Sequence, residues 1–281
     1  MKIQRTHLLK RLDTLYLSYN TSFGNWKNKD HYVNLRGPSG SGKTTLILEW
    51  LEQHKHFYFS FAGLDEPMAL RLLGERLQKY MDEHNLPALP MDTWENVFLN
   101  INKLSERTCH IFAFDDSDEI LTDNVFSTAF QNNFATQKRR AILMIFVTRE
   151  EKLPEFPPDY TKWTYDEIPI DVPYFSIADL CKCFPNKKGD DLLALYALTG
   201  GIPQLVHLIS ENLSTEENLR SLLFPDSPYI HFFQMSLTTF SVGAKAICSF
   251  VTPSRSAITA LVILVNLRGS HITNAISISA F

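Results

Sequence analysis

The stretch that decides the fold runs from His31 to Trp50 and reads HYVNLRGPSGSGKTTLILEW. Its centre, residues 37–44, fits the pattern G-x-x-x-x-G-K-[ST], which is typical of loops that bind phosphate. A short apolar run precedes this centre, and an amphipathic run with helical spacing follows it as far as residue 53. An ordinary Gly/Ser turn needs neither of these neighbours. The stretch therefore predicts a strand, a phosphate-binding loop and a helix in succession.

The residue types in this loop suit the chemistry of a polyphosphate. Backbone N–H groups can surround phosphates only where side chains leave room, and glycine also reaches the positive φ angles that such a loop requires. The helix behind the loop directs unpaired N–H groups and its positive dipole end at the anion. Lys43 is expected to neutralise the β- and γ-phosphates, and the Thr44 hydroxyl to coordinate Mg²⁺. The predicted nucleotide-binding residues are Gly37, Pro38, Ser39, Gly40, Ser41, Gly42, Lys43, Thr44 and Thr45.

A second set of candidate residues follows the apolar run IFAF, residues 111–114. Ligands bind at the carboxyl ends of the strands in open α/β sheets, so Asp115 is the predicted second ligand of the magnesium ion, beside Thr44. A neighbouring carboxylate has to polarise the attacking water; Asp116 is the first candidate and Glu119 the second. For both of these acids, a solvated position in a loop remains the alternative interpretation.

The apolar run AILMIFV, residues 141–147, ends in Thr148 and Arg149. A continuous apolar run is typical of a strand that is buried on both faces. A polar residue at the end of the strand beside the phosphate-loop strand can sense the γ-phosphate, and Thr148 is the candidate for this catalytic role. Arg149 is a candidate for charge stabilisation, and an ordinary surface position is the alternative for it.

Strand and helix patterns alternate along most of the chain, which predicts an α/β sheet that is mostly parallel. The expected strands are residues 32–35, 56–62, 109–114, 141–147 and 163–170. The expected helices are residues 6–18, 44–53, 66–80, 94–104 and 124–136. After residue 173 the composition changes, and helices are expected at 176–184, 190–198 and 203–213. We therefore predict an α/β domain at 1–172, a small helical domain at 173–226 and a last segment at 227–281.

Composition limits the class of protein and its partners. The chain has 281 residues, of which 44% are hydrophobic and 21% charged, and these are ordinary globular proportions. A net charge of -4 gives no global basic field for nucleic acid or a membrane surface. The four cysteines show no zinc spacing and are expected to be free thiols in a reducing compartment. Because the N-terminus lacks a secretory signal and no apolar run is long enough to span a membrane, the expected location is the cytoplasm.

Several motifs, taken in order, resemble one family. They are GPSGSGKTTL, the aromatic run HFYFSF, the pair Trp94-Glu95, IFAFDDSDEIL, AILMIFVT and ALTGGIPQLV. From Ile3 to Phe250 the chain resembles the archaeal-type ATPases of the STAND group, which are P-loop NTPases related to AAA+ proteins. The resemblance implies an α/β P-loop NTPase core of AAA+ type with a parallel sheet, a C-terminal helical lid and then a winged-helix domain. It also implies that the turn at Gly200 and Gly201 lies against the nucleotide, with Pro203 near the adenine.

Two regions depart from the family pattern. The family usually has Asp-Glu after the acidic strand, whereas this chain has Asp115 and Asp116. Because aspartate is one methylene shorter than glutamate, either hydrolysis is slow or Glu119 substitutes for the usual glutamate. The segment from Val251 to Phe281 does not match the pattern well, so residues 227–281 are expected to form a truncated or divergent, partial winged-helix-like tail.

The predicted function is that of a nucleotide-driven switch. ATP and Mg²⁺ bind, water converts ATP to ADP and phosphate, and the change moves the helical lid. The alternative is a regulatory module that binds ATP or ADP with little or no hydrolysis. A kinase for a small acceptor is disfavoured, because residues 150–160, EEKLPEFPPDY, do not resemble an arginine-bearing lid. Besides ATP and ADP, the expected partners are a protein or a second copy of the chain, with DNA by family analogy alone and no membrane.

Overall fold

The computed structural model describes residues 5–21, 31–105, 110–135, 142–149, 166–187, 189–224 and 227–230. The chain divides into two compact units, one that holds residues 4–173 and one that begins at Tyr174. We call them the α/β unit and the helical unit, and each is described by itself. From residue 231 onward, the predicted winged-helix-like tail lies outside the described residues.

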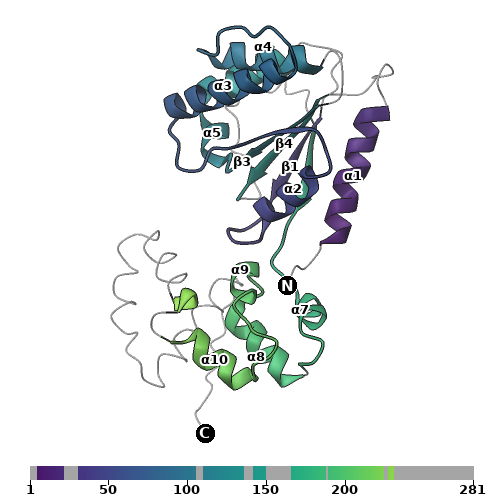
Figure 1. Ribbon diagram of the computed structural model, residues 1–281, viewed down its shortest axis with the longest axis vertical. Coiled ribbons are helices and arrows are strands. Elements are labelled where there is room, and N and C mark those ends of the chain that lie inside the picture. Colours follow the sequence, from purple (N-terminus) through teal and green to yellow (C-terminus); the bar gives the residue numbers. More distant parts are fainter. Residues whose placement is uncertain are drawn as a thin grey trace. The chain divides into compact units, whose positions relative to one another are not determined.

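The described strands of the α/β unit form one parallel, five-stranded sheet in the order β2-β3-β4-β1-β5 (Figure 1). The strands are β1 (His31–Arg36), β2 (His56–Ser60), β3 (His110–Asp115), β4 (Ile142–Thr148) and β5 (Asp166–Asp171). This arrangement confirms the predicted α/β fold with a parallel sheet. Because the strands are parallel, the loops that follow β1, β3 and β4 leave from the same edge of the sheet.

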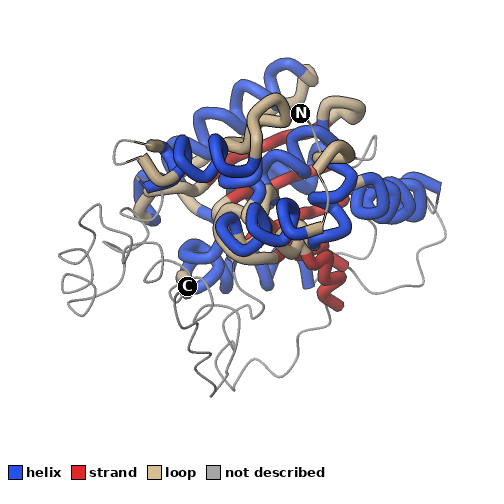
Figure 2. The backbone as a smooth tube through the Cα atoms, turned by 90° about the horizontal axis from the view of Figure 1, so that it is seen from below, coloured by secondary structure: helices blue, strands red, loops and turns tan. Residues whose placement is uncertain are grey.

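Helices of this unit pack on both faces of the sheet. Figure 2 shows the strands in red and the helices in blue. On one face lie α1 (Thr6–Thr21) and α2 (Lys43–Leu51), which pack on aliphatic strand residues. On the other face lie α3 (Glu66–Glu83), α4 (Trp94–Ser105), α5 (Asp118–Thr122) and α6 (Asn124–Ala135). The sheet is therefore the middle of three layers.

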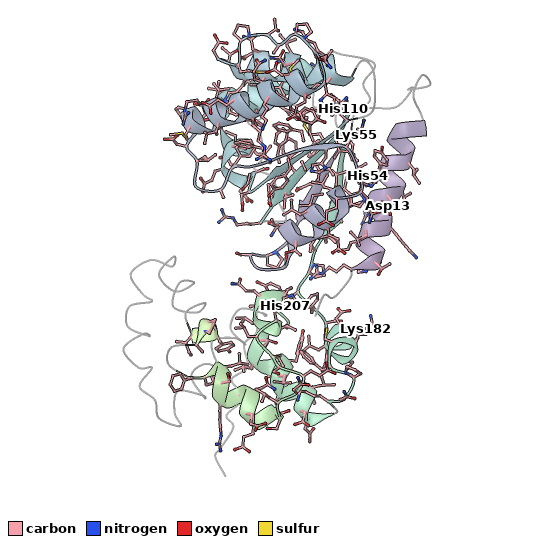
Figure 3. All side chains as sticks on the ribbon, in the orientation of Figure 1. Asp13, His54, Lys55, His110, Lys182 and His207 are labelled. Carbon is pink, nitrogen blue, oxygen red and sulfur yellow. The ribbon has the colours of Figure 1, made fainter. Side chains whose placement is uncertain are left out.

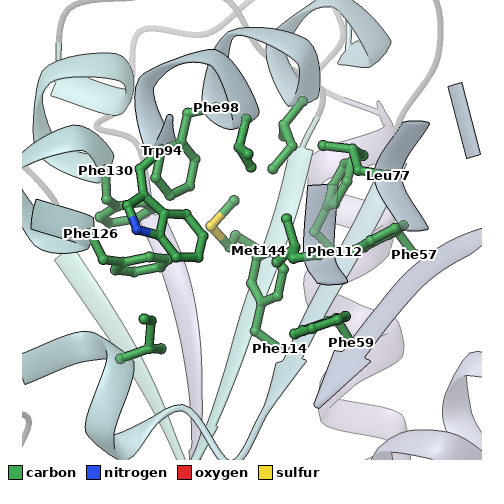
Figure 4. Close-up of a cluster of buried hydrophobic side chains, with 14 of the residues drawn as sticks. Phe57, Phe59, Leu77, Trp94, Phe98, Phe112, Phe114, Phe126, Phe130 and Met144 are labelled. Carbon is green, nitrogen blue, oxygen red and sulfur yellow. The ribbon is translucent and has the colours of Figure 1, made fainter. Parts of the chain in front are cut away.

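The face under α3, α4 and α6 has an aromatic core (Figure 4). Phe112 and Phe114 of β3 point to this face, and Ile111 and Ala113 point to the other, because side chains alternate along a strand. The rings of Phe126 and Phe130 on α6 lie 7° from parallel, and Trp94 meets Phe126 edge-on at 4.9 Å between centroids. Each such pair contributes about 0.5–1.5 kcal/mol beyond the burial of its area. The core thus accounts for much of the chain's phenylalanine.

The N-terminal helix α1 is fixed to α2. Leu8 and Leu12 of α1 are buried, and the indole Nε1 of Trp50 donates a hydrogen bond to Asp13 Oδ1 over 2.7 Å. Figure 3 shows Asp13 beside His54, whose Nε2 lies 3.7 Å from the same oxygen. The His54 ring also packs on Trp50, with 4.5 Å between centroids. These contacts anchor the helix that begins at the end of the glycine-rich loop.

The described part of the helical unit contains α7 (Ile177–Cys183), α8 (Asp190–Thr199), α9 (Pro203–Val206) and α10 (Thr215–Leu222). Capping boxes begin α7 at Ser176 and α10 at Ser214, and each satisfies two backbone N–H groups. Leu180, Leu195 and Leu205 are fully buried between the helices. These helices match the helical character that the composition predicts after residue 173.

The end of this unit differs from the sequence-based prediction. A single helix was expected at residues 203–213, but α9 ends at Val206, and α10 was not predicted. The reason is Asn218, whose buried amide donates to the carbonyls of Ser210, Leu213 and Ser214 and accepts from the Ser210 N–H. Because a side chain satisfies these backbone groups, residues 210–214 do not need a helix to satisfy them.

Candidate functional site

The glycine-rich loop, residues 37–42, joins β1 to α2. Gly40 and Gly42 have φ angles of 75° and 86°, a region that glycine adopts without steric cost. Gly37 serves a different purpose, because a Cβ atom there would lie 2.3 Å from the carbonyl oxygen of Val172. The loop therefore needs glycine for backbone conformation at two positions and for space at a third.

The outer side of this loop faces solvent. Pro38 and Ser39 are exposed, and so are Thr44 and Thr45 in the first turn of α2. Gly42 is the N-cap of this nine-residue helix and, having no side chain, makes no side-chain capping hydrogen bond. The loop thus offers backbone N–H groups and a helix N-terminus to an anion, with hydroxyl groups beside them.

Lys43 lies inside the loop and is only 9% exposed. Its Nζ donates to the Gly37 carbonyl over 2.6 Å and to the Pro38 carbonyl over 3.1 Å. Burial lowers the pKa of the Lys43 ammonium, and the charges of three nearby acids oppose that effect; in decreasing order they are Asp118, Asp115 and Asp116. A cation is therefore enclosed by the loop and faced by carboxylates.

Ser41 carries the one buried hydroxyl of the loop. The residue is fully buried, and its Oγ has no hydrogen-bond partner among the described residues. Leaving a buried hydroxyl unsatisfied costs about 1–3 kcal/mol. An anion or water with a lone pair directed at Oγ would remove this cost. The loop therefore fits a phosphate group both in its backbone and in this orphaned donor.

Side chains of β2 hold two acids in place, Asp115 at the end of β3 and Asp116 directly after it. Asp115 is 2% exposed; its Oδ2 accepts from the Tyr58 hydroxyl over 2.9 Å, and its Oδ1 from the backbone N–H of Asp116. Asp116 has a φ angle of 51°, and its Oδ2 accepts from Ser60 Oγ over 3.2 Å. Burial, followed by the charge of Asp115, raises the pKa of the Tyr58 hydroxyl, so Tyr58 remains a donor. Glu119, the second candidate for water activation, is exposed on α5.

The end of β4 lies directly beside the glycine-rich loop. Thr148 pairs with Arg36 of β1, and its carbonyl accepts from the Gly37 N–H over 3.3 Å. The Thr148 hydroxyl is buried and donates to Asn34 Oδ1 over 2.8 Å. Arg149 follows it, and its side chain is half-exposed. The sheet order thus brings together the ends of β1, β4 and β3, where the sequence predicted the loop, Thr148 and the acids.

Four residues that hydrogen-bond to the candidate site residues were not identified from the sequence. Tyr58 and Ser60 stand at alternate positions of the run HFYFSF, and Asn34 is a polar residue in an apolar strand. Asp118 is the third acid of the run DDSD, and its Oδ1 accepts from the Arg149 N–H over 2.8 Å. The alternation in HFYFSF was a usable signal, since it places Tyr58 and Ser60 on one side of the strand.

Pro203 lies apart from these residues in the chain. It is buried in the helical unit as the first residue of α9, after Gly200 and Gly201, whose φ angles are 59° and 69°. Its proposed position near an adenine therefore stays a prediction.

The side-chain oxygen atoms at the site can hold a magnesium ion only together with phosphate oxygens. Thr44 and Asp115 supply oxygen atoms, which Mg²⁺ prefers. Among the described residues there is no group of three or more His, Cys, Asp or Glu that could hold a metal ion. A magnesium ion at this edge would thus need phosphate oxygens and water to complete its six ligands.

In the described part of the chain, no helix is both long and apolar enough to cross a membrane.

Comparison with known proteins bears on the fold. No protein-family model matches the chain, and no curated protein matches it. Among solved structures, a Walker-type ATPase of Pyrococcus abyssi is similar with a TM-score of 0.58 and 16% identity over 95% of this chain and 89% of that one. The Aeropyrum pernix Orc1 protein, solved in complex with DNA, has a TM-score of 0.51 and 14% identity over 97% of this chain and 80% of that one. The α/β unit has the P-loop NTPase fold. At such low identity the likeness establishes this fold and leaves the chemistry to the residues themselves.

Proposed function

We propose that this protein binds ATP with Mg²⁺ at the loop of residues 37–45 and hydrolyses it to ADP and phosphate, acting as a nucleotide-driven switch. We further propose that it belongs to the archaeal-type STAND group of AAA+-related ATPases. The observation that carries the proposal is the enclosed ammonium of Lys43, which lies within a loop of three structurally required glycines. The orphaned Ser41 hydroxyl in the same loop supports it, because a bound phosphate would supply the missing acceptor.

The residues divide the chemistry among them. Backbone N–H groups of the loop and of the α2 N-terminus hold the phosphates, and the Lys43 ammonium exchanges its two carbonyl partners for phosphate oxygens. Thr44 and Asp115 hold the metal, which when bound withdraws charge from the transferring phosphoryl group. Asp116 orients the attacking water and Thr148 contacts the terminal phosphate, with both side chains positioned by bonds to Ser60 and Asn34.

A second candidate function is nucleotide binding without turnover. It is favoured by the hydrogen bond that Asp116 already accepts from Ser60, and by the exposed position of Glu119. Phosphate release from the parent, Asp116→Asn and Glu119→Gln separates the two functions. Hydrolysis predicts that Asp116→Asn is much slower than the parent. Equal, very slow release by all three proteins, with ATP still bound, would establish the binding module.

The main test is calorimetric titration with ATP at millimolar magnesium. Lys43→Ala should weaken ATP binding on the order of 100-fold, because each charge-assisted hydrogen bond contributes about 1.5–3 kcal/mol. Lys79→Ala, an exposed lysine on α3, is the matched control and should bind like the parent. Unchanged affinity in Lys43→Ala, or no heat from the parent, would contradict the proposal.

DNA is suggested by the family resemblance and by the similar Orc1 protein, which was solved with DNA bound. A DNA-binding role for this chain, and likewise self-association or a protein partner, is a proposal that the site itself does not require. Titration of labelled duplex DNA with the protein, with and without ATP, tests the first, and sedimentation under the same conditions tests the second.

A further inference from the structure

Asp118 ties the start of α5 to the turn after β4. Its Oδ1 accepts from the Arg149 N–H over 2.8 Å, and its Oδ2 lies 3.5 Å from Arg149 Nε. The neighbouring Ser117 makes a parallel link, because its N–H donates to the Val147 carbonyl over 3.0 Å. The carboxylate is therefore fixed at the carboxyl edge of the sheet, between the ends of β3 and β4.

This carboxylate faces a second cation as well. Of the three acids whose charges oppose the effect of burial on the pKa of Lys43, Asp118 acts most strongly, and Arg149 acts in the opposite sense. Asp118 thus lies within the field of both Lys43 and Arg149. Lys43 begins α2 and Arg149 directly follows β4, so both cations lie near the sheet edge where the phosphate chain is proposed to bind.

The ion pair of Asp118 with Arg149 contributes little to stability. The Arg149 side chain is 53% exposed, and half-exposed ion pairs are weak. The Asp118 Oδ2 atom is buried, however, and makes no hydrogen bond to any described residue, so the guanidinium at 3.5 Å is its one partner among them. An anion that takes the guanidinium from Asp118 therefore leaves a buried carboxylate oxygen without a partner, which costs free energy.

We propose that Asp118 is an internal counter-ion that competes with the terminal phosphate of a bound nucleotide for Arg149 and Lys43. It thereby weakens the binding of a triphosphate relative to a diphosphate. This inference rests on the proposed function. The physical reason is that a third phosphate adds negative charge at the sheet edge where the Asp118 carboxylate already lies, and like charges in a partly buried site repel. A diphosphate lacks that group and is affected less.

The test compares a non-hydrolysable ATP analogue with ADP by calorimetry at millimolar magnesium. Asp118→Asn removes the charge but keeps an oxygen to accept from the Arg149 N–H. We expect it to raise affinity for the analogue 5- to 10-fold and for ADP less than 2-fold. Glu75→Gln is the matched control, since it also removes one charge and breaks an arginine pair, 2.8 Å long, on α3. It should change neither affinity.

A second variant isolates the role of the arginine. In an Arg149→Gln background, the gain from Asp118→Asn should shrink, because one of the two cations in dispute is gone. An undiminished gain would overturn the competition for Arg149. If the parent binds both nucleotides but Asp118→Asn leaves the ratio of analogue affinity to ADP affinity unchanged, the inference is overturned and the proposed function is not. The same holds if the only effect of Asp118→Asn is a lower melting temperature of the protein. Binding of neither nucleotide by the parent would instead overturn the proposed function.

Discussion

Two glycine turns, one in each unit, share a close approach of a neighbouring carbonyl. At the first, the Val172 N–H donates to the Arg36 carbonyl over 2.7 Å, and a Cβ on Gly37 would lie 2.3 Å from the Val172 carbonyl oxygen. At the second, the Phe175 N–H donates to the Gly201 carbonyl over 2.8 Å, and a Cβ on Gly201 would lie 2.0 Å from the Phe175 carbonyl oxygen. In both turns glycine allows a neighbouring carbonyl to approach.

The two turns lead into very different helices. The first leads into nine-residue α2, whose first residue is Lys43, whereas the second leads into α9, four residues long, which begins with Pro203. Proline has no N–H to offer, and so short a helix has a weak dipole. The comparison teaches that a glycine turn shows where backbones pack closely, and that the helix behind the turn decides whether an anion can bind.

The largest effect should come from Gly201→Ala, because two costs combine there. The added Cβ meets a backbone carbonyl, and the φ angle of 69° is unfavourable for alanine. We expect the helical unit to lose about 3–5 kcal/mol of stability. All four tryptophans lie at or before residue 163, so tryptophan fluorescence reports the α/β unit alone. The loss should appear in the urea transition followed by circular dichroism, with the fluorescence transition unmoved.

Gly37→Ala should have the next largest effect, and in the other unit. Only steric contacts are at issue, chiefly with the Val172 carbonyl and then with Ser41 Oγ at 3.2 Å, since Gly37 does not have a positive φ angle. We expect a loss of about 2–3 kcal/mol in the tryptophan transition. ATP binding should also weaken, because the loop must shift to admit the methyl group. Weakened folding with unchanged ATP affinity would separate the close packing of this turn from phosphate binding.

The response to acid should also distinguish the units. Burial, followed by the charges of His84 and Lys55, lowers the pKa of His110 at the start of β3 from 6.5 to about 4 (Figure 3). Below pH 6.5 the unfolded chain takes up this proton and the folded chain does not, so the α/β unit loses stability as pH falls from 6.5 toward 4. We expect a loss of roughly 1–2 kcal/mol between pH 6.5 and 5 in the tryptophan transition. A slope that persists in His110→Gln would assign it to another group.

The smallest effects should come from two glycines that have positive φ angles and open surroundings. Gly63 in the α/β unit and Gly189 in the helical unit have φ angles of 70° and 47°, and a Cβ at either would meet no atom within 4 Å. Alanine should cost about 1 kcal/mol at Gly63 from backbone strain alone, and about 1–3 kcal/mol at Gly189, whose ψ angle of -114° lies outside the left-handed helical region. These variants are the controls for Gly37→Ala and Gly201→Ala. A loss at Gly63 as large as that of Gly201→Ala would show that strain, and not the close carbonyl, dominates at Gly201, since Gly37 has no positive φ angle.

The fold could be predicted in large part because two neighbouring strands, β3 and β4, correspond to apolar runs in the sequence. Residues 142–148 are buried along their whole length, as expected for a central strand of a parallel sheet. The prediction of a helix failed at residues 207–213, where the backbone depends on the side chain of Asn218. A periodic pattern cannot show that one buried amide will satisfy carbonyls several residues earlier in the chain.

The loop of the candidate site could be predicted because its chemistry is local. Glycines, lysine and threonine stand in one stretch, and each acts within a few residues of its neighbours. Tyr58 and Ser60 could not be assigned in the same way, because their partners are about 57 residues away and depend on the register in which Ser60 faces Asp115. Asp118 was missed for a similar reason, since its partner Arg149 is 31 residues away and comes beside it only when β3 and β4 pair.

The left-handed backbone at Asp116 limits which residue types this position accepts without strain. Aspartate is among the few residues other than glycine that occupy a φ angle near 51° readily, whereas a longer side chain is strained there. The length of the carboxylate side chain at this position thus depends on the main-chain geometry. Replacing Asp116 by glutamate would lengthen the side chain and also strain the backbone at this position. The measured rate of ATP hydrolysis would therefore reflect both changes together.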